Sequence, residues 1–207
     1  MIASEIIARF NLQVDDSSEL SSTEELALLN QCYREIQNDR SWEWLKTEET
    51  ATTSISVPYI ALPSDFRTLS PNMEGAYQYG NESVVYVGVD YEPFRVINFS
   101  NRRDYRDRNG ICYIDIPNSR LVFTKQPSSA RSVEYDYLMK APDLITSAEP
   151  LFDDVYHEVL AYGMAAKFDA IQLTNKNESY SREDEAMYLS ILEQMQMVDS
   201  QIKLTIA

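Results

Sequence analysis

The hydrophobic pattern of this 207-residue sequence changes twice along the chain, from a helical period to a strand-like pattern and back. Over residues 21–40, apolar side chains recur at spacings of three and four, which places them on one helical face. These residues are Leu26, Leu29, Tyr33 and Ile36. Ser22 followed by Glu25 fits a capping box at the start of this helix. Apolar residues between positions 2 and 10 predict a shorter helix before it.

The middle of the chain, from residue 47 onward, is rich in Thr, Ser, Ile and Val and favours extended structure. Strands are predicted at 83–89, 94–99, 111–116, 120–124 and 132–138. Pro117, Asn118 and Ser119 separate the third and fourth of these segments and predict a hairpin turn. The middle region is therefore predicted to be β-rich.

Helical spacing returns after Pro150. One helix is predicted from about Asp153, and the apolar residues on its face are Val155, Val159, Tyr162 and Ala166. Small residues in this segment, such as Gly163, would let another helix approach closely. A second helix is predicted to begin near Ser181, whose hydroxyl can cap it.

These patterns predict an α+β protein, in which a helical bundle formed by the N- and C-terminal helices carries an inserted β-rich domain. The expected boundaries are 1–46 for the N-terminal helices, 47–147 for the inserted domain, 148–199 for the C-terminal helices and 200–207 for a C-terminal arm. An alternative architecture places two independent helical pieces on a central β domain.

The acidic residues are concentrated in the two helical parts. The sequence has 33 acidic and 18 basic side chains, a net charge of −15, of which residues 1–50 and 148–207 each contribute −7. Such a surface repels phosphate, which excludes a general role in coating DNA or RNA. We expect neither a signal peptide nor a membrane span, and we expect Cys32 and Cys112 to be buried free thiols in a reducing cytosol.

No pattern in the sequence points to an active site. His157 is the single histidine, close to Asp153 and Asp154, and without a metal-binding spacing it is interpreted as a structural residue. The many acidic residues single out no catalytic carboxylate pair. Neither a G-x-S-x-G elbow nor a glycine-rich phosphate motif is found. We therefore expect no enzymatic activity, no cofactor and no metal site.

Two features suit contacts with other proteins. The first is a run of four arginines within seven residues, in which two aspartates offset half of the charge: Arg102, Arg103, Arg106 and Arg108. It is either a surface that meets an acidic partner or a nucleic-acid backbone, or a solvated loop or short helix. The second is the abundance of tyrosine, fourteen residues, which gives large rigid contacts with a polar tip. Tyr77 and Tyr79 lie in a segment with few aliphatic residues and are expected to be partly exposed.

The order of several short segments resembles that of the tailed-bacteriophage head–tail adaptor proteins, also called connector or head-completion proteins. The segments are N-Q-C-Y-R-E-I at 30–36, W-E-W-L at 42–45, Y-I-A-L-P-S-D-F-R at 59–67, G-I-C-Y-I at 110–114, R-L-V-F at 120–123, S-V-E-Y-D-Y at 132–137, P-D-L at 142–144 and E-P-L-F at 149–152. A long alanine-rich helix from Asp153 follows them. Single segments are weakly specific, but their succession covers roughly residues 25–175.

This resemblance implies a helical bundle with a β-rich insertion and a structural role in the virion. Adaptors of this kind form a ring, typically a dodecamer, that docks on the portal protein, extends the DNA channel and gives the tail or nozzle proteins a platform. Double-stranded DNA would pass through the ring without specific binding. By analogy, 200–207 would be the portal-docking arm, with Ile202, Leu204 and Ile206 as its apolar contacts. The arginine run and the two tyrosines would then contact a neighbouring subunit or the tail.

Two other functions remain open at this stage. One is an adaptor that also degrades peptidoglycan, although no acidic residue can be assigned to that reaction. The other is a generic cytosolic protein-interaction domain. In the leading interpretation the protein is found at the head–tail interface of the virion, and in the host cytoplasm during assembly.

Overall fold

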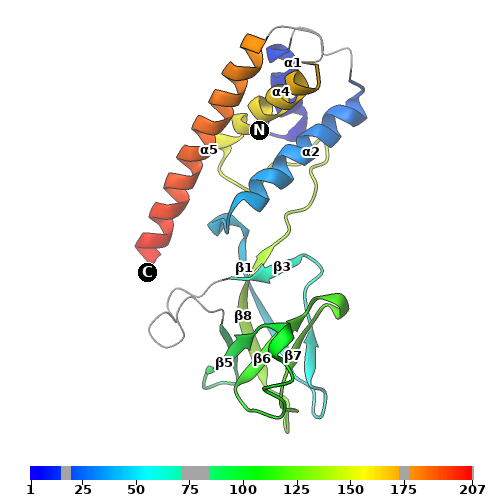
Figure 1. Cartoon of the computed structure of the whole chain (residues 1–207), viewed down its shortest axis with the longest axis vertical. Helices are drawn as coiled ribbons and strands as arrows, with labels where there is room; N and C mark the ends of the chain where they lie inside the picture. The colour runs from blue at the N-terminus through cyan, green and yellow to red at the C-terminus, as the bar shows by residue number, and fades with distance from the viewer. Residues whose placement is uncertain (15–19, 71–83, 173–177, 207) are drawn as a thin grey trace. The chain divides into compact units, whose positions relative to one another are not determined.

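The computed structural model describes residues 1–14, 20–70, 84–172 and 178–206, and these divide into two compact units. One unit consists of Met1–Trp44 and Ala141–Ile206 and contains the long helices. The other consists of Leu45–Lys140 and contains the strands, as Figure 1 shows.

The helical unit is built around one central helix. The described residues form α1 (Ala3–Gln13), α2 (Ser22–Asp39), α4 (Glu158–Gln172) and α5 (Glu178–Ile206). Two short 3₁₀ turns, η2 (Glu43–Leu45) and η5 (Asp154–Tyr156), precede β1 and α4. Helix α4 packs against each of the other three helices, and α1 also packs against α2. Because α4 is surrounded, it is apolar on most sides, whereas the sequence pattern predicted a single face.

Two details of the predicted helices are corrected by the structure. The capping box of α2 is formed by Ser21 and Glu24, one residue earlier than predicted, with the backbone N–H of Ser21 donating to Glu24 Oε2 at 2.8 Å. Both Ser-x-x-Glu pairs satisfy the motif, and the observed register buries Glu25, whose carboxylate accepts a bond from Asn11. Val155 lies in η5 and is exposed, because α4 begins only at Glu158.

A buried polar side chain ties the second half of the chain to α2. Asn30 donates through Nδ2 to the carbonyl of Leu144 at 3.0 Å, and its Oδ1 accepts from the Leu144 N–H at 2.7 Å. The side-chain amide of Asn30 thus makes two hydrogen bonds to the backbone of Leu144. These bonds satisfy the buried polar groups of both residues. Tyr33, one turn later, accepts a bond from the Leu151 N–H. These two residues of the 30–36 segment therefore position the chain that leads into α4.

The prediction that another helix could approach α4 closely is confirmed at Gly163. A Cβ atom at this position would lie 3.1 Å from the ring of Tyr188 on α5 and 3.5 Å from the sulfur of Cys32 on α2. Glycine therefore allows three helices to meet at this point.

The sheet unit contains a mixed sheet of eight strands within the described residues. The strands are β1 (Lys46–Thr52), β2 (Tyr59–Ala61), β3 (Phe66–Leu69), β4 (Val84–Val87), β5 (Glu92–Ile97), β6 (Ile111–Asp115), β7 (Arg120–Phe123) and β8 (Ser132–Met139). They are ordered β1-β8-β4-β5-β6-β7-β2, and β3 also pairs with β8. All pairs are antiparallel except β5 with β6. The predicted hairpin between β6 and β7 is confirmed.

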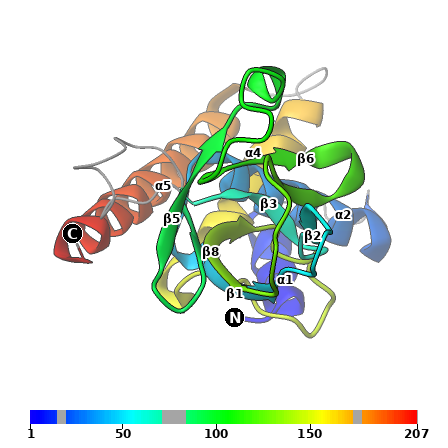
Figure 2. The same ribbon diagram turned by 90° about the horizontal axis from the view of Figure 1, so that it is seen from below.

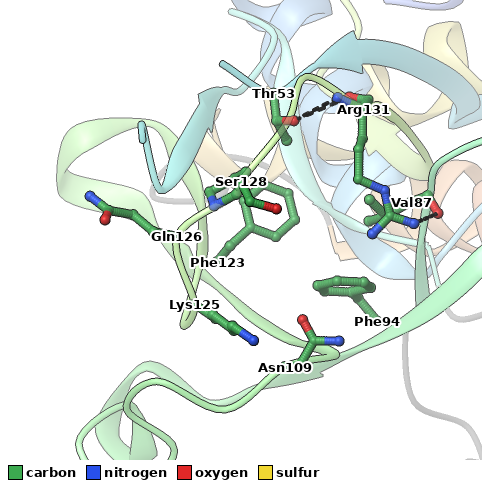
Figure 3. A pocket seen from close by; sticks show the side chains of 10 residues that line it. Thr53, Val87, Phe94, Asn109, Phe123, Lys125, Gln126, Ser128 and Arg131 are labelled. Atoms are coloured by element: carbon green, nitrogen blue, oxygen red, sulfur yellow. Dashed lines mark hydrogen bonds between the residues drawn. The ribbon is translucent and has the colours of Figure 1, made fainter. Parts of the chain in front are cut away.

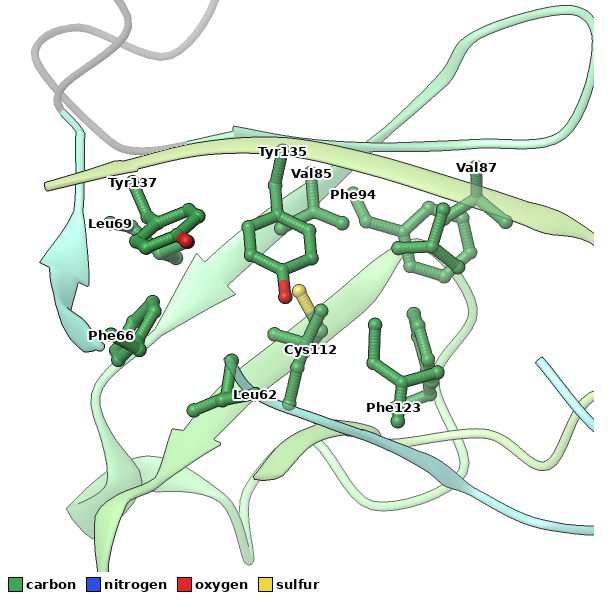
Figure 4. Packing of buried hydrophobic residues seen from close by; sticks show 13 residues of the cluster. Leu62, Phe66, Leu69, Val85, Val87, Phe94, Cys112, Phe123, Tyr135 and Tyr137 are labelled. Carbon is green, nitrogen blue, oxygen red and sulfur yellow. The ribbon is translucent and has the colours of Figure 1, made fainter. Parts of the chain in front are cut away.

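The sheet is nearly closed into a barrel. Strand β2, at one end of the order, leads after four residues into β3, which pairs with β8 near the other end. Figure 2 shows the strands curling around a common interior. Buried side chains from most strands fill this interior, among them Val85, Phe94, Cys112, Leu121 and Tyr135, as Figure 4 shows for the cluster.

The predicted architecture, a bundle of terminal helices with a β-rich insert, is wrong. The described residues contain four helices and a mixed, nearly closed, barrel-like sheet, and the helices do not form a terminal bundle that frames a β insert. Helix α5 has 29 residues and α1 has 11, lengths of roughly 43 and 16 Å, so the helices cannot pack side by side along their whole length. The parallel pairing of β5 with β6 and the closure through β2 and β3 involve residues that are distant in sequence.

Candidate interaction surfaces

The arginine run lies in the connection between the two parallel strands. Consecutive parallel strands need a long crossover, because the chain must return to the end of the sheet from which it started. Here residues 98–110 make that return between β5 and β6, beginning with the 3₁₀ turn η3 (Phe99–Asn101). We call residues 98–110 the arginine loop.

Both ends of the arginine loop are fixed to the sheet. At its start, the Phe99 ring packs edge-on against Tyr113 of β6, with ring centroids 5.7 Å apart. At its end, Thr124 accepts from the Asp107 N–H at 3.1 Å through its carbonyl and donates from its hydroxyl to the Arg108 carbonyl at 2.6 Å. The loop is therefore a defined structural element of this unit.

The four arginines of the loop differ in what they contact. The guanidinium of Arg102 lies over the Phe99 ring at 3.8 Å, and that of Arg108 lies near the Tyr105 ring at 5.2 Å. Arg106 pairs with Asp107 at 3.7 Å, but both side chains are more than four-fifths exposed, so this ion pair is weak. Arg103 is exposed and has no ion-pair partner among the described residues. Arg103 and Arg106 are thus the exposed cations of this loop that do not lie over one of its aromatic rings.

The segment predicted as a C-terminal arm continues α5 in the structure. The helix extends to Ile206, so residues 200–206 are helical. Ile202 is 42% exposed, and Met197 and Val198, one turn earlier, are also exposed. Leu204 and Ile206 belong to the last two turns of the same helix. A helical end with exposed apolar residues suits insertion into a groove better than addition to a sheet edge.

The C-terminal half of α5 is attached to the end of α2 by an ion pair between the buried Asp199 and the partly exposed Arg40. The Asp199 carboxylate lies 3.7 Å from Arg40 Nε and accepts a bond from the Glu43 N–H at 2.7 Å. Arg40 also donates to the Gln196 carbonyl at 3.0 Å, and its guanidinium lies 5.4 Å from the Trp42 ring centroid. These contacts fix the direction of the last turns of α5 relative to α2.

The reactive side chains that the sequence singled out are packed in the interior. Cys32 and Cys112 are free and buried, as predicted, and burial raises the pKa of the Cys32 thiol to about 12. His157 is buried, with its ring nitrogens 3.0 Å from the Phe152 carbonyl and 2.7 Å from the Met1 amine. Within the described part of the chain, no group of three or more His, Cys, Asp or Glu side chains is placed to hold a metal ion.

The two units differ strongly in charge. The helical unit carries 21 acidic and 7 basic side chains, a net charge of −14, whereas the sheet unit carries 12 and 11, a net charge of −1. The arginine loop thus belongs to the nearly neutral unit, and the acidic surface belongs to the helical one. Tyr77 and Tyr79 lie outside the described residues.

Sequence reasoning missed a small cavity in the sheet unit, shown in Figure 3, whose polar lining includes Asn109, Lys125 and Arg131. Asn109 comes from the connection between β5 and β6, whereas Lys125 and Arg131 come from the connection between β7 and β8, and the three carry no common sequence motif. Only the closure of the sheet brings them together.

Comparison with known proteins gives one family. The sequence model of the family described as SU10 adaptor protein matches residues 1–204, which includes both units. No curated protein matches the chain. No helix among the described residues combines the length and the apolar character that a membrane span requires.

Proposed function

Because this chain belongs to the SU10 adaptor protein family, we propose that it is a structural protein of a phage virion and forms the ring between head and tail. In this role it docks on the portal protein, extends the DNA channel and provides the platform to which tail proteins attach. The observation that carries the proposal is the family match over residues 1–204, nearly the whole chain. The proposed role is assembly, and no reaction is proposed.

The charge distribution supports a channel through which DNA passes without binding. Each phosphate paired with a lysine or arginine would add affinity and would retard the moving duplex. The helical unit, with a net charge of −14, instead repels phosphate. We infer that acidic surfaces of this unit line or flank the lumen.

The arginine loop supports a contact between neighbouring subunits. Copies of a chain with a net charge of −15 repel one another, and ring closure requires contacts that overcome this repulsion. Arg103 and Arg106 are exposed cations on the nearly neutral unit, and the helical unit of a neighbour supplies a surplus of carboxylates. We propose this pairing for the ring, with twelve copies as the expected number.

The end of α5 is the proposed portal-docking element. Its exposed residue Ile202, together with the apolar residues Leu204 and Ile206 of its last turns, would contact a groove on the portal. The ion pair of Arg40 with Asp199 would hold this helix in position for docking.

The docking proposal is tested by mixing the purified chain with its portal protein and imaging the product by electron microscopy. The wild-type chain should form a ring of fixed stoichiometry on the portal. Ile202→Asp should reduce the occupancy of that ring strongly, whereas Leu12→Asp, at an exposed apolar position of α1, should leave it unchanged. Equal occupancy for both variants would refute the assignment of α5.

The subunit contact is tested by charge reversal in the arginine loop. Arg103→Glu and Arg106→Glu should each lower the yield of closed rings on the portal, and lower salt should not restore it. Lys140→Glu is the matched control, because this lysine is exposed in the same unit and lies outside the loop. If all three variants form rings equally well, the loop does not hold subunits together.

A further inference from the structure

A cavity of about 100 Å³ opens at one end of the sheet unit, where β1, β4 and β7 end. Phe94 and Phe123 form its apolar part, with ring centroids 5.8 Å apart in an edge-to-face contact. Figure 3 shows the polar ends of Lys125, Asn109 and Ser128 directed toward the space beside these rings. The cavity therefore has an apolar side and a polar rim.

The cationic side of the cavity is held in place by specific contacts. The guanidinium of Arg131 donates to the Val87 carbonyl at 3.1 Å and to Glu92 Oε2 at 2.9 Å. Gly88 allows this placement, because a Cβ atom there would lie 2.7 Å from Arg131 Nη2, and its φ of +81° is one that glycine adopts without strain. Asn109 donates to the other oxygen of Glu92 at 3.4 Å. Glu92 thus orders two lining residues without itself lining the cavity.

Lys125 supplies a positive charge that this network does not neutralise. It is exposed, and within the described residues its ammonium has neither an ion pair nor a hydrogen bond. The lining contains Lys125 and Arg131 but no Asp or Glu. In a chain with a net charge of −15, this makes the cavity a local site for a negative group.

The size of the cavity limits the ligand. Sites for cofactors and drug-sized ligands have volumes of about 300 Å³ or more. A cavity of about 100 Å³ instead suits one side chain or a few water molecules. A ligand that uses both sides of the cavity needs a short apolar stem, to lie against Phe94 and Phe123, and an anionic end, to reach Lys125.

We propose that this cavity binds the side chain of a glutamate of a partner protein. The methylene groups of the glutamate would lie against the two phenylalanine rings. Its carboxylate would accept hydrogen bonds from Lys125 and from the Ser128 hydroxyl. Every residue that forms the site belongs to the sheet unit of one chain, so binding can be measured on the chain alone.

The test is a titration of the isotope-labelled full chain with a short peptide, followed by nuclear magnetic resonance. The probe is acetyl-Leu-Glu-Leu-amide, and the neutral control is acetyl-Leu-Gln-Leu-amide. The backbone amides of Gly88, Asn109 and Arg131 should shift saturably with the glutamate peptide. The glutamine peptide should bind about tenfold more weakly, because the ion pair of a carboxylate with Lys125 is replaced by a hydrogen bond from Lys125 to an uncharged amide.

Two lysine variants locate the interaction. Lys125→Gln should weaken binding of the glutamate peptide by about fivefold, as expected for a partly exposed ion pair. Lys140→Gln removes an exposed lysine of the same unit outside the cavity and should leave binding unchanged. Unshifted resonances elsewhere in the Lys125 variant show that it is folded.

Four results would overturn the proposal. They are equal affinity for the two peptides, shifts confined to residues away from the cavity, full binding by the Lys125 variant, and no saturable shift up to about 10 mM peptide. Each of these results would show that the cavity does not select a glutamate side chain through Lys125.

Discussion

Replacing Asp199 with Asn should destabilise the helical unit by about 2–3 kcal/mol. The side chain of Asp199 is only 5% exposed, and its carboxylate has two identified partners, the Arg40 guanidinium at 3.7 Å and the Glu43 N–H at 2.7 Å. Asparagine has nearly the same shape, so the substitution removes charge and creates no cavity. In the variant, the uncharged amide of asparagine faces the Arg40 guanidinium, which has then lost the negative charge of Asp199.

The magnitude follows from the two partners. Breaking a fully buried ion pair costs about 3–5 kcal/mol, but Arg40 is 30% exposed and can be partly solvated, which reduces this share to about 1–2 kcal/mol. A backbone N–H bonded to a carboxylate is stronger than one bonded to an amide by about 1 kcal/mol. The two contributions together give the expected 2–3 kcal/mol.

The matched control is Asp143→Asn. Asp143 pairs with Arg34 through two hydrogen bonds of 2.8 and 2.9 Å, which are shorter than the contact of Asp199 with Arg40. Both side chains of this pair are more than half exposed, so the expected loss is much smaller than that of Asp199→Asn. The comparison therefore separates the effect of burial from the effect of distance.

The assay is urea unfolding at neutral pH, followed by the helical circular dichroism signal and extrapolated to water. An Arg40→Gln variant and the double variant complete a mutant cycle, in which a coupling of about 1 kcal/mol or more is expected. Equal losses for Asp199→Asn and Asp143→Asn would show that burial does not determine the strength of these pairs. A coupling near zero would show that Arg40 is not the partner that matters.

Three further predictions follow from local features of the helical unit. Ser21→Ala should lower the unfolding free energy measured in urea by about 1 kcal/mol, and Ser22→Ala by only a few tenths, because only Ser21 caps α2. A larger loss for Ser22→Ala than for Ser21→Ala would contradict the observed position of the cap. Gly163→Val should cost about 2 kcal/mol by overpacking, because a Cβ there lies 3.1 Å from the Tyr188 ring, and an unchanged unfolding midpoint would refute the close contact. Burial raises the pKa of both Cys32 and Tyr188 to about 12, so the unfolded state loses these protons at lower pH than the folded state. These two groups should therefore leave the unfolding free energy unchanged between about pH 6 and 8 and lower it above about pH 9, and a rise above pH 9 would contradict their burial.

The secondary structure could be predicted from the sequence where local patterns determine it. The helical spacing of Leu29, Tyr33 and Ile36 predicted α2. The three-residue turn that begins at Pro117 predicted the pairing of β6 with β7. The register of the α2 cap was missed because two serines and two glutamates stand next to each other. The burial of Glu25 against Asn11 decides between them, and this contact depends on how α1 packs.

The architecture could not be predicted, because it depends on pairings between distant residues. The parallel pair of β5 and β6 and the closure of the sheet through β2 and β3 have no counterpart in any short pattern. For the same reason, the arginine loop could be predicted from the sequence and the cavity could not. The arginine loop is continuous in sequence and could be found as a charge run, whereas the cavity combines residues from Thr53 to Arg131 and becomes visible only in the folded sheet.

The most direct measurement of the proposed function is cryo-electron microscopy of purified phage particles that carry this protein. We predict a closed ring of the chain between portal and tail, with the end of α5 in contact with the portal and the arginine loop against a neighbouring helical unit. Particles that are infectious, that have a complete tail and that lack density for this chain would contradict the proposal.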